Sequence, residues 1–289
     1  MPDPIVCLGE TLWDVLPSGE FLGGAPCNVA AHLARLGVPV FLVSRVGADA
    51  HGRAALERMR TLGLDTAYVQ IDPWLPTGIA RAALDAKGGA SYEFLSPAAW
   101  DRIEADARTL ECAHRAAATV FGTLLQRTAA GAGVVQRVLD ASRWRVLDLN
   151  LRAPHDSREV VLASLARADF VKLNEAEARR VADWLGVADE PAALLEALAS
   201  RYDTESLCVT RAARGAVLWH DGEWIEQAAL PSAVVDTVGA GDAFLAMLLA
   251  ELLDGRHARL AMERAVRLAA FVASQPGAVP DYAAARFRA

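Results

Sequence analysis

Short apolar runs alternate along this chain with longer segments in which apolar residues recur at helical spacing. Val29, Leu33 and Leu36, for example, fall on one helical face, and Gly37 follows as a stop. The alternation predicts an α/β protein with a mostly parallel, doubly wound sheet and helices on both faces, which binds ligands beyond the carboxyl ends of its strands. The expected strands are 5–9, 40–45, 119–121, 146–149, 170–173 and 207–210, and the expected helices include 28–36, 53–62, 133–141, 175–185 and 192–200.

Two regions depart from this alternation. Residues 218–225 contain an Asp-Gly pair between apolar residues and read as a hairpin. Residues 71–100 alternate in polarity on both sides of a Lys-Gly-Gly turn at 87–89, which predicts a second hairpin. We expect one domain over residues 1–289, in which about 11–22 and 71–100 form a small β lid over the ligand-binding edge. Such a lid excludes water from a reacting site.

Composition narrows the class of protein. The chain has 289 residues, 53% of them hydrophobic and 22% charged, as in an ordinary globular protein. Its formal net charge is −7 without a cluster of basic residues, which argues against nucleic acid as a partner. No run of about 18 apolar residues and no signal peptide is recognisable, so we expect no membrane span and a cytoplasmic location. The four cysteines form no C-x-x-C pair, which favours free thiols.

The most informative segment is 236–244, Asp-Thr-Val-Gly-Ala-Gly-Asp-Ala-Phe. An uninterrupted apolar run follows it, so a helix is expected to begin at or near Gly241, and its first N–H groups then form an anion site. Asp242 places a carboxylate in that site, as phosphoryl transfer requires of a group that accepts a hydroxyl proton. On its own, Asp242 could equally complement the helix dipole.

Two other nucleotide sites are disfavoured. The chain contains no G-x-x-x-x-G-K-[ST] sequence, which argues against a P-loop ATPase. Phe244 stands where the dinucleotide fingerprint requires a third glycine or alanine, and the segment lies late in the chain. A Rossmann dehydrogenase is therefore not expected.

Residues 236–244 resemble the C-terminal signature of the ribokinase-like (pfkB) carbohydrate kinases. The resemblance implies that Asp242 is the catalytic base and that the backbone of Gly239, Ala240 and Gly241 forms an anion hole for the transferred group.

Residues 23–30, Gly-Gly-Ala-Pro-Cys-Asn-Val-Ala, resemble the N-terminal signature of the fructokinase branch of this family. From the residues alone, Asn28 is expected to be the N-cap of a helix. The resemblance implies instead that Gly24 and Asn28 contact a sugar, and that Asp14 accepts hydrogen bonds from sugar hydroxyls. It further implies sugar-side positions for Gly47, Phe94 and Arg152.

On the nucleotide side, Asn174 and Glu177 are spaced as an N-cap and the N3 residue of a capping box. The resemblance implies that Glu177 also helps to organise Mg²⁺ through water. Residues 209–216 resemble the family's V-T-x-G-x-x-G turn, but Ala212 replaces the first glycine, which costs about 1 kcal/mol if that position has a positive φ. The implied nucleotide-binding residues are Asn174, Thr210, Arg211, Gly215, Gly239, Gly241 and Gly277.

Together these resemblances imply an ATP-dependent sugar kinase of the fructokinase type, converting D-fructose to fructose 6-phosphate. Kinases for 2-keto-3-deoxygluconate, ribose or adenosine, and a catalytically silent sugar-binding relative, stay open as alternatives. The implied cofactors are ATP and Mg²⁺, with K⁺ as a further ion that family members bind beside the anion hole. The expected partners are small molecules, sugar and ATP, and an exposed apolar lid face would favour a homodimer formed through the lid.

Overall fold

The structure is a computed structural model that describes residues 3–16, 19–84 and 90–288. Among these residues, nine strands form one sheet in the order β13-β12-β11-β10-β9-β8-β1-β4-β5. Every neighbouring pair from β5 to β11 is parallel, and β12 and β13 add an antiparallel edge. The strands are β1 (Ile5–Leu8), β4 (Val40–Gly47), β5 (Val69–Asp72), β8 (Ala118–Phe121), β9 (Arg145–Asp148), β10 (Phe170–Asn174), β11 (Ser206–Thr210), β12 (Ala216–His220) and β13 (Glu223–Gln227).

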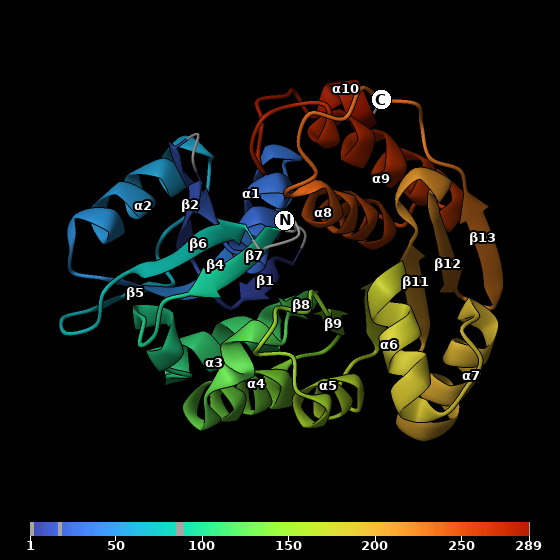
Figure 1. Ribbon diagram of the computed structural model, residues 1–289, viewed down its shortest axis with the longest axis horizontal. Helices are drawn as coiled ribbons and strands as arrows, with labels where there is room; N and C mark the ends of the chain where they lie inside the picture. Colours follow the sequence, from blue (N-terminus) through green and yellow to red (C-terminus); the bar gives the residue numbers. More distant parts are fainter. Residues whose placement is uncertain (1–2, 17–18, 85–89, 289) are drawn as a thin grey trace.

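Helices cover both faces of this sheet, as predicted (Figure 1). One layer contains α1 (Ala25–Arg35), α2 (Ala50–Thr61), α8 (Ala240–Leu253), α9 (Ala258–Ala273) and the short α10 (Ala285–Arg288). The other contains α3 (Ala107–Arg115), α4 (Ala129–Ala141), α5 (Arg158–Leu165), α6 (Glu175–Leu185) and α7 (Pro191–Tyr202). Short 3₁₀ turns occur at η1 (Ala99–Arg102), η2 (Leu124–Arg127) and η3 (Ala212–Arg214).

Each helical layer has its own buried apolar cluster against one face of the sheet. The helix α8 lies deepest, because it is buried on all sides from Ala243 to Glu251. Its apolar residues therefore show no single face, as expected for a helix inside the core. In the part of the chain that the structure describes, no helix combines the length and hydropathy needed to cross a membrane.

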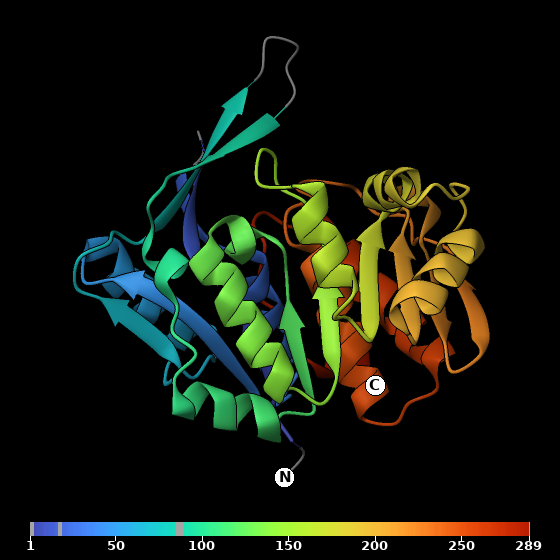
Figure 2. The ribbon, with the colours of Figure 1, turned by 90° about the horizontal axis from the view of Figure 1, so that it is seen from below.

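A second sheet of four strands, in the order β3-β2-β6-β7, lies beyond the carboxyl ends of the parallel strands (Figure 2). Its strands are β2 (Leu12–Leu16), β3 (Gly19–Gly23), β6 (Gly78–Leu84) and β7 (Ala90–Phe94). The predicted pairing of β6 with β7 is confirmed, although the Lys-Gly-Gly turn at 87–89 lies outside the described residues. The predicted lid segment 71–100 begins too early. Its first two residues belong to β5, which pairs in parallel with β4 in the large sheet.

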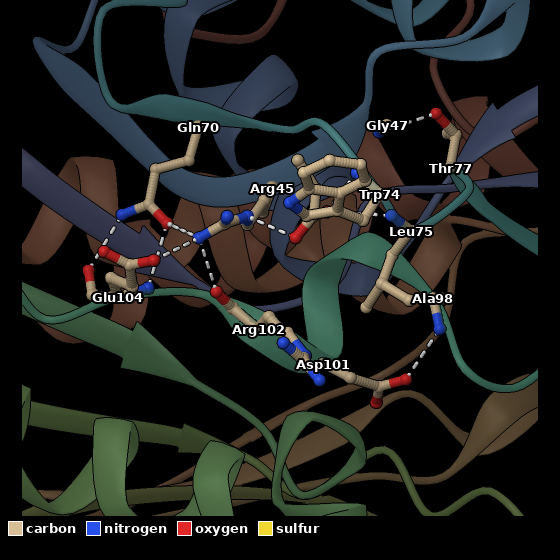
Figure 3. A network of polar contacts seen from close by, with 11 residues as sticks. Arg45, Gly47, Gln70, Trp74, Leu75, Thr77, Ala98, Asp101, Arg102 and Glu104 are labelled. Carbon is tan, nitrogen blue, oxygen red and sulfur yellow. Dashed lines mark hydrogen bonds and ion pairs between the residues drawn. The ribbon is translucent and has the colours of Figure 1, made fainter.

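Polar contacts anchor the connection from β5 to the small sheet (Figure 3). The buried carboxylate of Asp72 accepts the N–H groups of Trp74 and Leu75, each at 2.8 Å. Arg45 forms an ion pair with Asp72 at 3.0 Å, and the Gly47 N–H donates to the Thr77 hydroxyl at 2.9 Å. These contacts thus fix the position at which the small sheet joins the rest of the protein.

Candidate active site

The α8 helix opens at Gly239, its N-cap, which has a φ of 78° and precedes the first helical residue, Ala240. The expected helix start near Gly241 is confirmed. A Cβ atom on Gly239 would lie 2.4 Å from the carbonyl oxygen of Ala278, so both the backbone conformation and the space require glycine. The first N–H groups of such a helix have no intrahelical acceptor and can bind an anion, so the anion site stays a prediction.

Asp242, in the first turn of α8, accepts a hydrogen bond from Nδ2 of Asn28 at 2.8 Å. The prediction that Asn28 caps a helix is wrong, because α1 begins at Ala25 with Gly24 as its N-cap. Pro26 explains the earlier start, since proline fits the first helical turn, where its missing N–H costs nothing. Asn28 therefore lies one turn inside α1, and its amide reaches across to α8.

The pKa of Asp242 is raised from 3.8 to about 6. Burial is the main cause, and the negative charge of Asp148 adds to it, while Lys172, Asn28 and Arg152 act in the opposite direction. A carboxylate that titrates close to neutral pH suits proton transfer from an alcohol. The geometry therefore supports Asp242 as a general base.

Lys172 is a candidate site residue that the sequence reasoning missed. Its ammonium group forms a buried ion pair with Asp148, with Nζ 2.9 Å from Oδ1. A Cβ atom on Gly241 would lie 3.2 Å from this Nζ, so the charge stands beside the first turn of α8. Burial disfavours the charge on Lys172, but the carboxylates of Asp148 and Glu177 outweigh it and raise the pKa of Lys172. A lysine within an otherwise apolar strand, in a chain with only one other lysine, was the available signal.

Asp14, in β2, interacts electrostatically with Asp242 and Arg152. Burial is the main cause that raises the pKa of Asp14 to about 6. The negative charges of Asp242 and Asp236 also raise this pKa, whereas the guanidinium of Arg152 lowers it. A Cβ atom on Gly23 would lie 2.1 Å from Oδ2 of Asp14, so this glycine leaves room for the carboxylate.

Glu10 is a second residue that the sequence reasoning missed. Its buried carboxylate accepts the N–H of Ala25 at 3.3 Å, and burial raises its pKa to about 7. Glu10 and Asp148 line one small cavity of about 10 Å³, together with Asn150. Two buried carboxylates, Glu10 and Asp148, therefore meet at this cavity.

The predicted capping box at the start of α6 is confirmed. The Glu177 N–H donates to Oδ1 of Asn174 at 2.9 Å, and Oε2 of Glu177 accepts the Asn174 N–H at 2.8 Å. The other oxygen, Oε1, accepts the N–H of Leu151 at 2.8 Å, and burial raises the pKa of Glu177. Over the described ranges, no three His, Cys, Asp or Glu residues converge as a ready-made metal cage, so a role of Glu177 toward Mg²⁺ stays a prediction.

The turn after β11 contains the alanine that replaces a glycine. Ala212 has a φ of 47°, so the positive φ considered for this position is present in the structure. Gly215 has a φ of 85°, and a Cβ atom there would lie 1.9 Å from the carbonyl oxygen of Gln227. Arg211 donates to Glu226 at 2.5 Å. The Thr210 hydroxyl donates to the backbone carbonyl of Leu173 at 3.3 Å.

The remaining predicted residues lie around this centre. Gly277 has a φ of 78° and donates its N–H to Asp236 at 3.3 Å, beneath the α8 opening. Gly47 lies at the base of the small sheet, where a Cβ atom would be 2.7 Å from the Thr77 nitrogen. Phe94, at the end of β7, packs edge-on against His155 with ring centroids 6.2 Å apart. The ligand contacts assigned to these residues stay predictions.

Comparisons with known proteins agree with this geometry. A family model described as pfkB family carbohydrate kinase matches residues 18–284. The chain is 30% identical to a fructokinase from Escherichia coli over 293 residues, covering 94% of each protein. It is 28% identical to a 2-dehydro-3-deoxygalactonokinase from Haloferax volcanii over 298 residues, covering 91% of this chain and 88% of the relative.

Among solved structures, fructokinase with bound ATP from Xylella fastidiosa resembles this chain with a TM-score of 0.83 and 25% identity. The match covers 96% of this chain and 94% of that one. Family model, sequence relatives and fold agree, and the chain belongs to the pfkB family of carbohydrate kinases.

Proposed function

We propose that this sugar kinase transfers the γ-phosphoryl group of ATP to the primary hydroxyl of D-fructose, giving fructose 6-phosphate and ADP. The observation that carries the proposal is the position of Asp242, a carboxylate with a raised pKa at the open N-terminus of α8. The similarity to fructokinases, one of them solved with ATP, supports both the acceptor and the donor.

In this reaction Asp242 takes the proton of the acceptor hydroxyl while that oxygen attacks the γ-phosphorus in line. The N–H groups from Gly239 to Asp242 stabilise the charge on the transferred phosphoryl group, an electrostatic contribution that is usually large. The ammonium of Lys172, held beside Gly241, adds a fixed positive charge on the same side. Asn28 orients the base through its hydrogen bond.

Magnesium, when bound with ATP, neutralises phosphate charge and usually keeps several of its waters. Two buried carboxylates fit such a water-mediated contact. Oδ2 of Asp148 has no hydrogen-bond partner among the described residues, and Glu177 lies close enough to shift the pKa of Lys172. We propose that these two residues hold the ion through water.

Sugar recognition is assigned to the side of Asp242 that faces β2. Asp14 and Asn28 supply acceptors and donors for vicinal hydroxyls, and Gly24 lets a ligand approach the backbone. The small sheet acts as the lid over this side, with Phe94 at its inner end. A polyol that donates to Asp14 would restore hydrogen bonds that burial removes from this carboxylate.

A sugar acid is the second candidate acceptor. The exposed guanidinium of Arg152 acts electrostatically on Glu10, Asp14 and Asp242, so it borders the acceptor space. A carboxylate on the substrate would pair with it, and the similarity to a 2-dehydro-3-deoxygalactonokinase favours this reading.

A coupled ADP-release assay decides between these acceptors. Fructose, ribose, adenosine, 2-keto-3-deoxygluconate and 2-keto-3-deoxygalactonate are compared at equal concentration, with Asp242→Asn as the inactive control. The proposal expects the highest kcat/KM with fructose and a 6-phosphate product by NMR. A higher kcat/KM with a keto-deoxy acid would assign the second candidate, and no ADP release with any acceptor would refute both.

A further inference from the structure

His32 is a buried imidazole in α1 whose two ring nitrogens both have partners. Nε2 lies 3.0 Å from the carbonyl oxygen of Ala278, and Nδ1 lies 2.8 Å from the hydroxyl of Tyr282. Because a carbonyl can only accept, Nε2 carries the proton of the neutral ring, and Nδ1 accepts from the tyrosine hydroxyl. Burial lowers the pKa of His32 to about 4, so this neutral form is maintained at neutral pH.

The segment that His32 holds supports the opening of α8. Built as an alanine, residue 239 would place its Cβ 2.4 Å from the Ala278 oxygen and 2.5 Å from the Ala278 Cα, so the two backbones are in direct contact. The neighbouring Gly277 donates its N–H to Asp236, at the start of the same turn. The direction of the anion-binding N–H groups therefore depends on where residues 276–278 lie.

The same helix also holds the catalytic base. Asn28 precedes His32 by four residues, so the two side chains project from one face of α1. Asn28 donates to Asp242, and His32 donates to the segment behind Gly239. Figure 1 shows α1 beside α8, with the C-terminal chain passing over both. One face of α1 thus contacts both parts of the phosphoryl-transfer site.

Packing holds this segment only in part: Ala278 is buried and Val279 and Tyr282 pack against the core, but the segment also borders open space. Residues 276–281 border a cleft of about 370 Å³, which Phe21, Leu22 and Asn28 also line. The nearby ion pair of Arg35 with Asp281 is formed by an almost fully exposed carboxylate and adds little. The bond from His32 to Ala278 is buried, whereas the bonds of Tyr282 to His32 and of Gly277 to Asp236 are only partly buried.

We infer that His32 is a positioning residue for phosphoryl transfer, which fixes Ala278 against Gly239 and so aims the N–H groups at the start of α8. This inference rests on the proposed function for its kinetic consequence, but its structural consequence can be measured without a substrate.

Three variants separate positioning from packing. His32→Leu removes both hydrogen bonds, His32→Gln offers an amide N–H to Ala278, and Tyr282→Phe removes only the bond to Nδ1. We expect His32→Leu to lower kcat on the order of 10–100-fold, with KM for sugar and ATP within about twofold of wild type. His32→Gln should recover part of that loss, and Tyr282→Phe should stay near wild-type kcat. His32→Asn, whose amide is too short to reach Ala278, replaces His32→Leu if the latter does not fold.

Hydrogen–deuterium exchange of the peptide covering 236–246, without ligands, is the second measurement. Exchange should accelerate in His32→Leu and stay near wild type in Tyr282→Phe. Wild-type exchange in His32→Leu, or equal effects of both variants on kcat, would overturn the inference. If the wild-type protein phosphorylates no acceptor, the proposed function fails, whereas the exchange experiment still decides the role of His32.

Discussion

Replacing Asp242 by asparagine should make the folded protein more stable at neutral pH while it abolishes most of the activity. The structure raises the pKa of Asp242 from 3.8 to about 6, and this difference corresponds to about 3 kcal/mol. Because the folded-state pKa is raised, the folded protein binds the proton more tightly than the unfolded chain. The free energy of unfolding therefore falls as the pH rises from about 4 to about 6, and above about 6 the full cost is present.

An asparagine carries no charge, and its side-chain oxygen can still accept the hydrogen bond from Asn28. Asp242 is only partly buried by surface area, so about 3 kcal/mol is an upper limit. We expect Asp242→Asn to gain about 1–3 kcal/mol over wild type at about pH 8, and the gain to vanish near pH 4.

Urea unfolding of both proteins at several pH values measures this difference. Glu10 and Asp14 also titrate in this range in both proteins, and the charge of Asp242 adds to their raised pKa values, so the comparison measures the loss of that charge together with its effect on these two neighbours. In the ADP-release assay, the variant should lose on the order of 10²–10⁴ in kcat. A variant as stable as wild type at every pH would refute the raised pKa of Asp242. Full activity of the variant would refute Asp242 as the general base.

Three further predictions concern single groups. The kcat/KM of the wild type should fall about tenfold per pH unit below about pH 6, as Asp242 becomes protonated, and a flat profile down to pH 4.5 would contradict its role as base. Ala212→Gly should raise the free energy of unfolding by about 1 kcal/mol in a urea titration, because φ at this position is 47°, and a loss of stability would show that the turn is unstrained. Lys172→Met should cost about 3 kcal/mol by leaving Asp148 buried without its partner. Adding Asp148→Leu should restore stability but not kcat, and failure of the double variant to regain stability would mean that the ion pair is not the reason for the loss.

The sequence predicted the large sheet well because its strands are short apolar runs that lie between helical patterns. The opening of α8 was also predictable, since two glycines and a carboxylate precede an unbroken apolar run. The start of α1 was not, because the N-cap preference of Asn28 suggested a later start than Pro26 allows. Asn28 instead donates to Asp242, which is 214 residues away in sequence, and no local preference indicates that contact.

The residues that the sequence did not reveal share one property, which is that their partners are distant in the chain. Lys172 lies within an apolar strand and Glu10 lies just after one, and the only local signal is the rarity of lysine in this chain. Lys172 pairs with Asp148, and Glu10 accepts an N–H group from the N-terminus of α1. These partners come close only in the folded protein. His32 likewise reads as one polar residue in an apolar helix until Ala278 is brought against it. The periodicity of the sequence predicts helices and strands, whereas contacts between distant residues become visible only in the folded structure.

The charges around Asp242 suit two different ligands. Glu10 and Asp14 both have raised pKa values, which favour a neutral partner that donates hydrogen bonds to them. The N-terminus of α8 and the ammonium of Lys172 beside Gly241 favour an anion instead. Asp242 interacts electrostatically with both Asp14 and Lys172, so the proposed base has an acceptor for a polyol and a cation for a phosphate near it. This arrangement is what the transfer of a phosphoryl group to an alcohol requires.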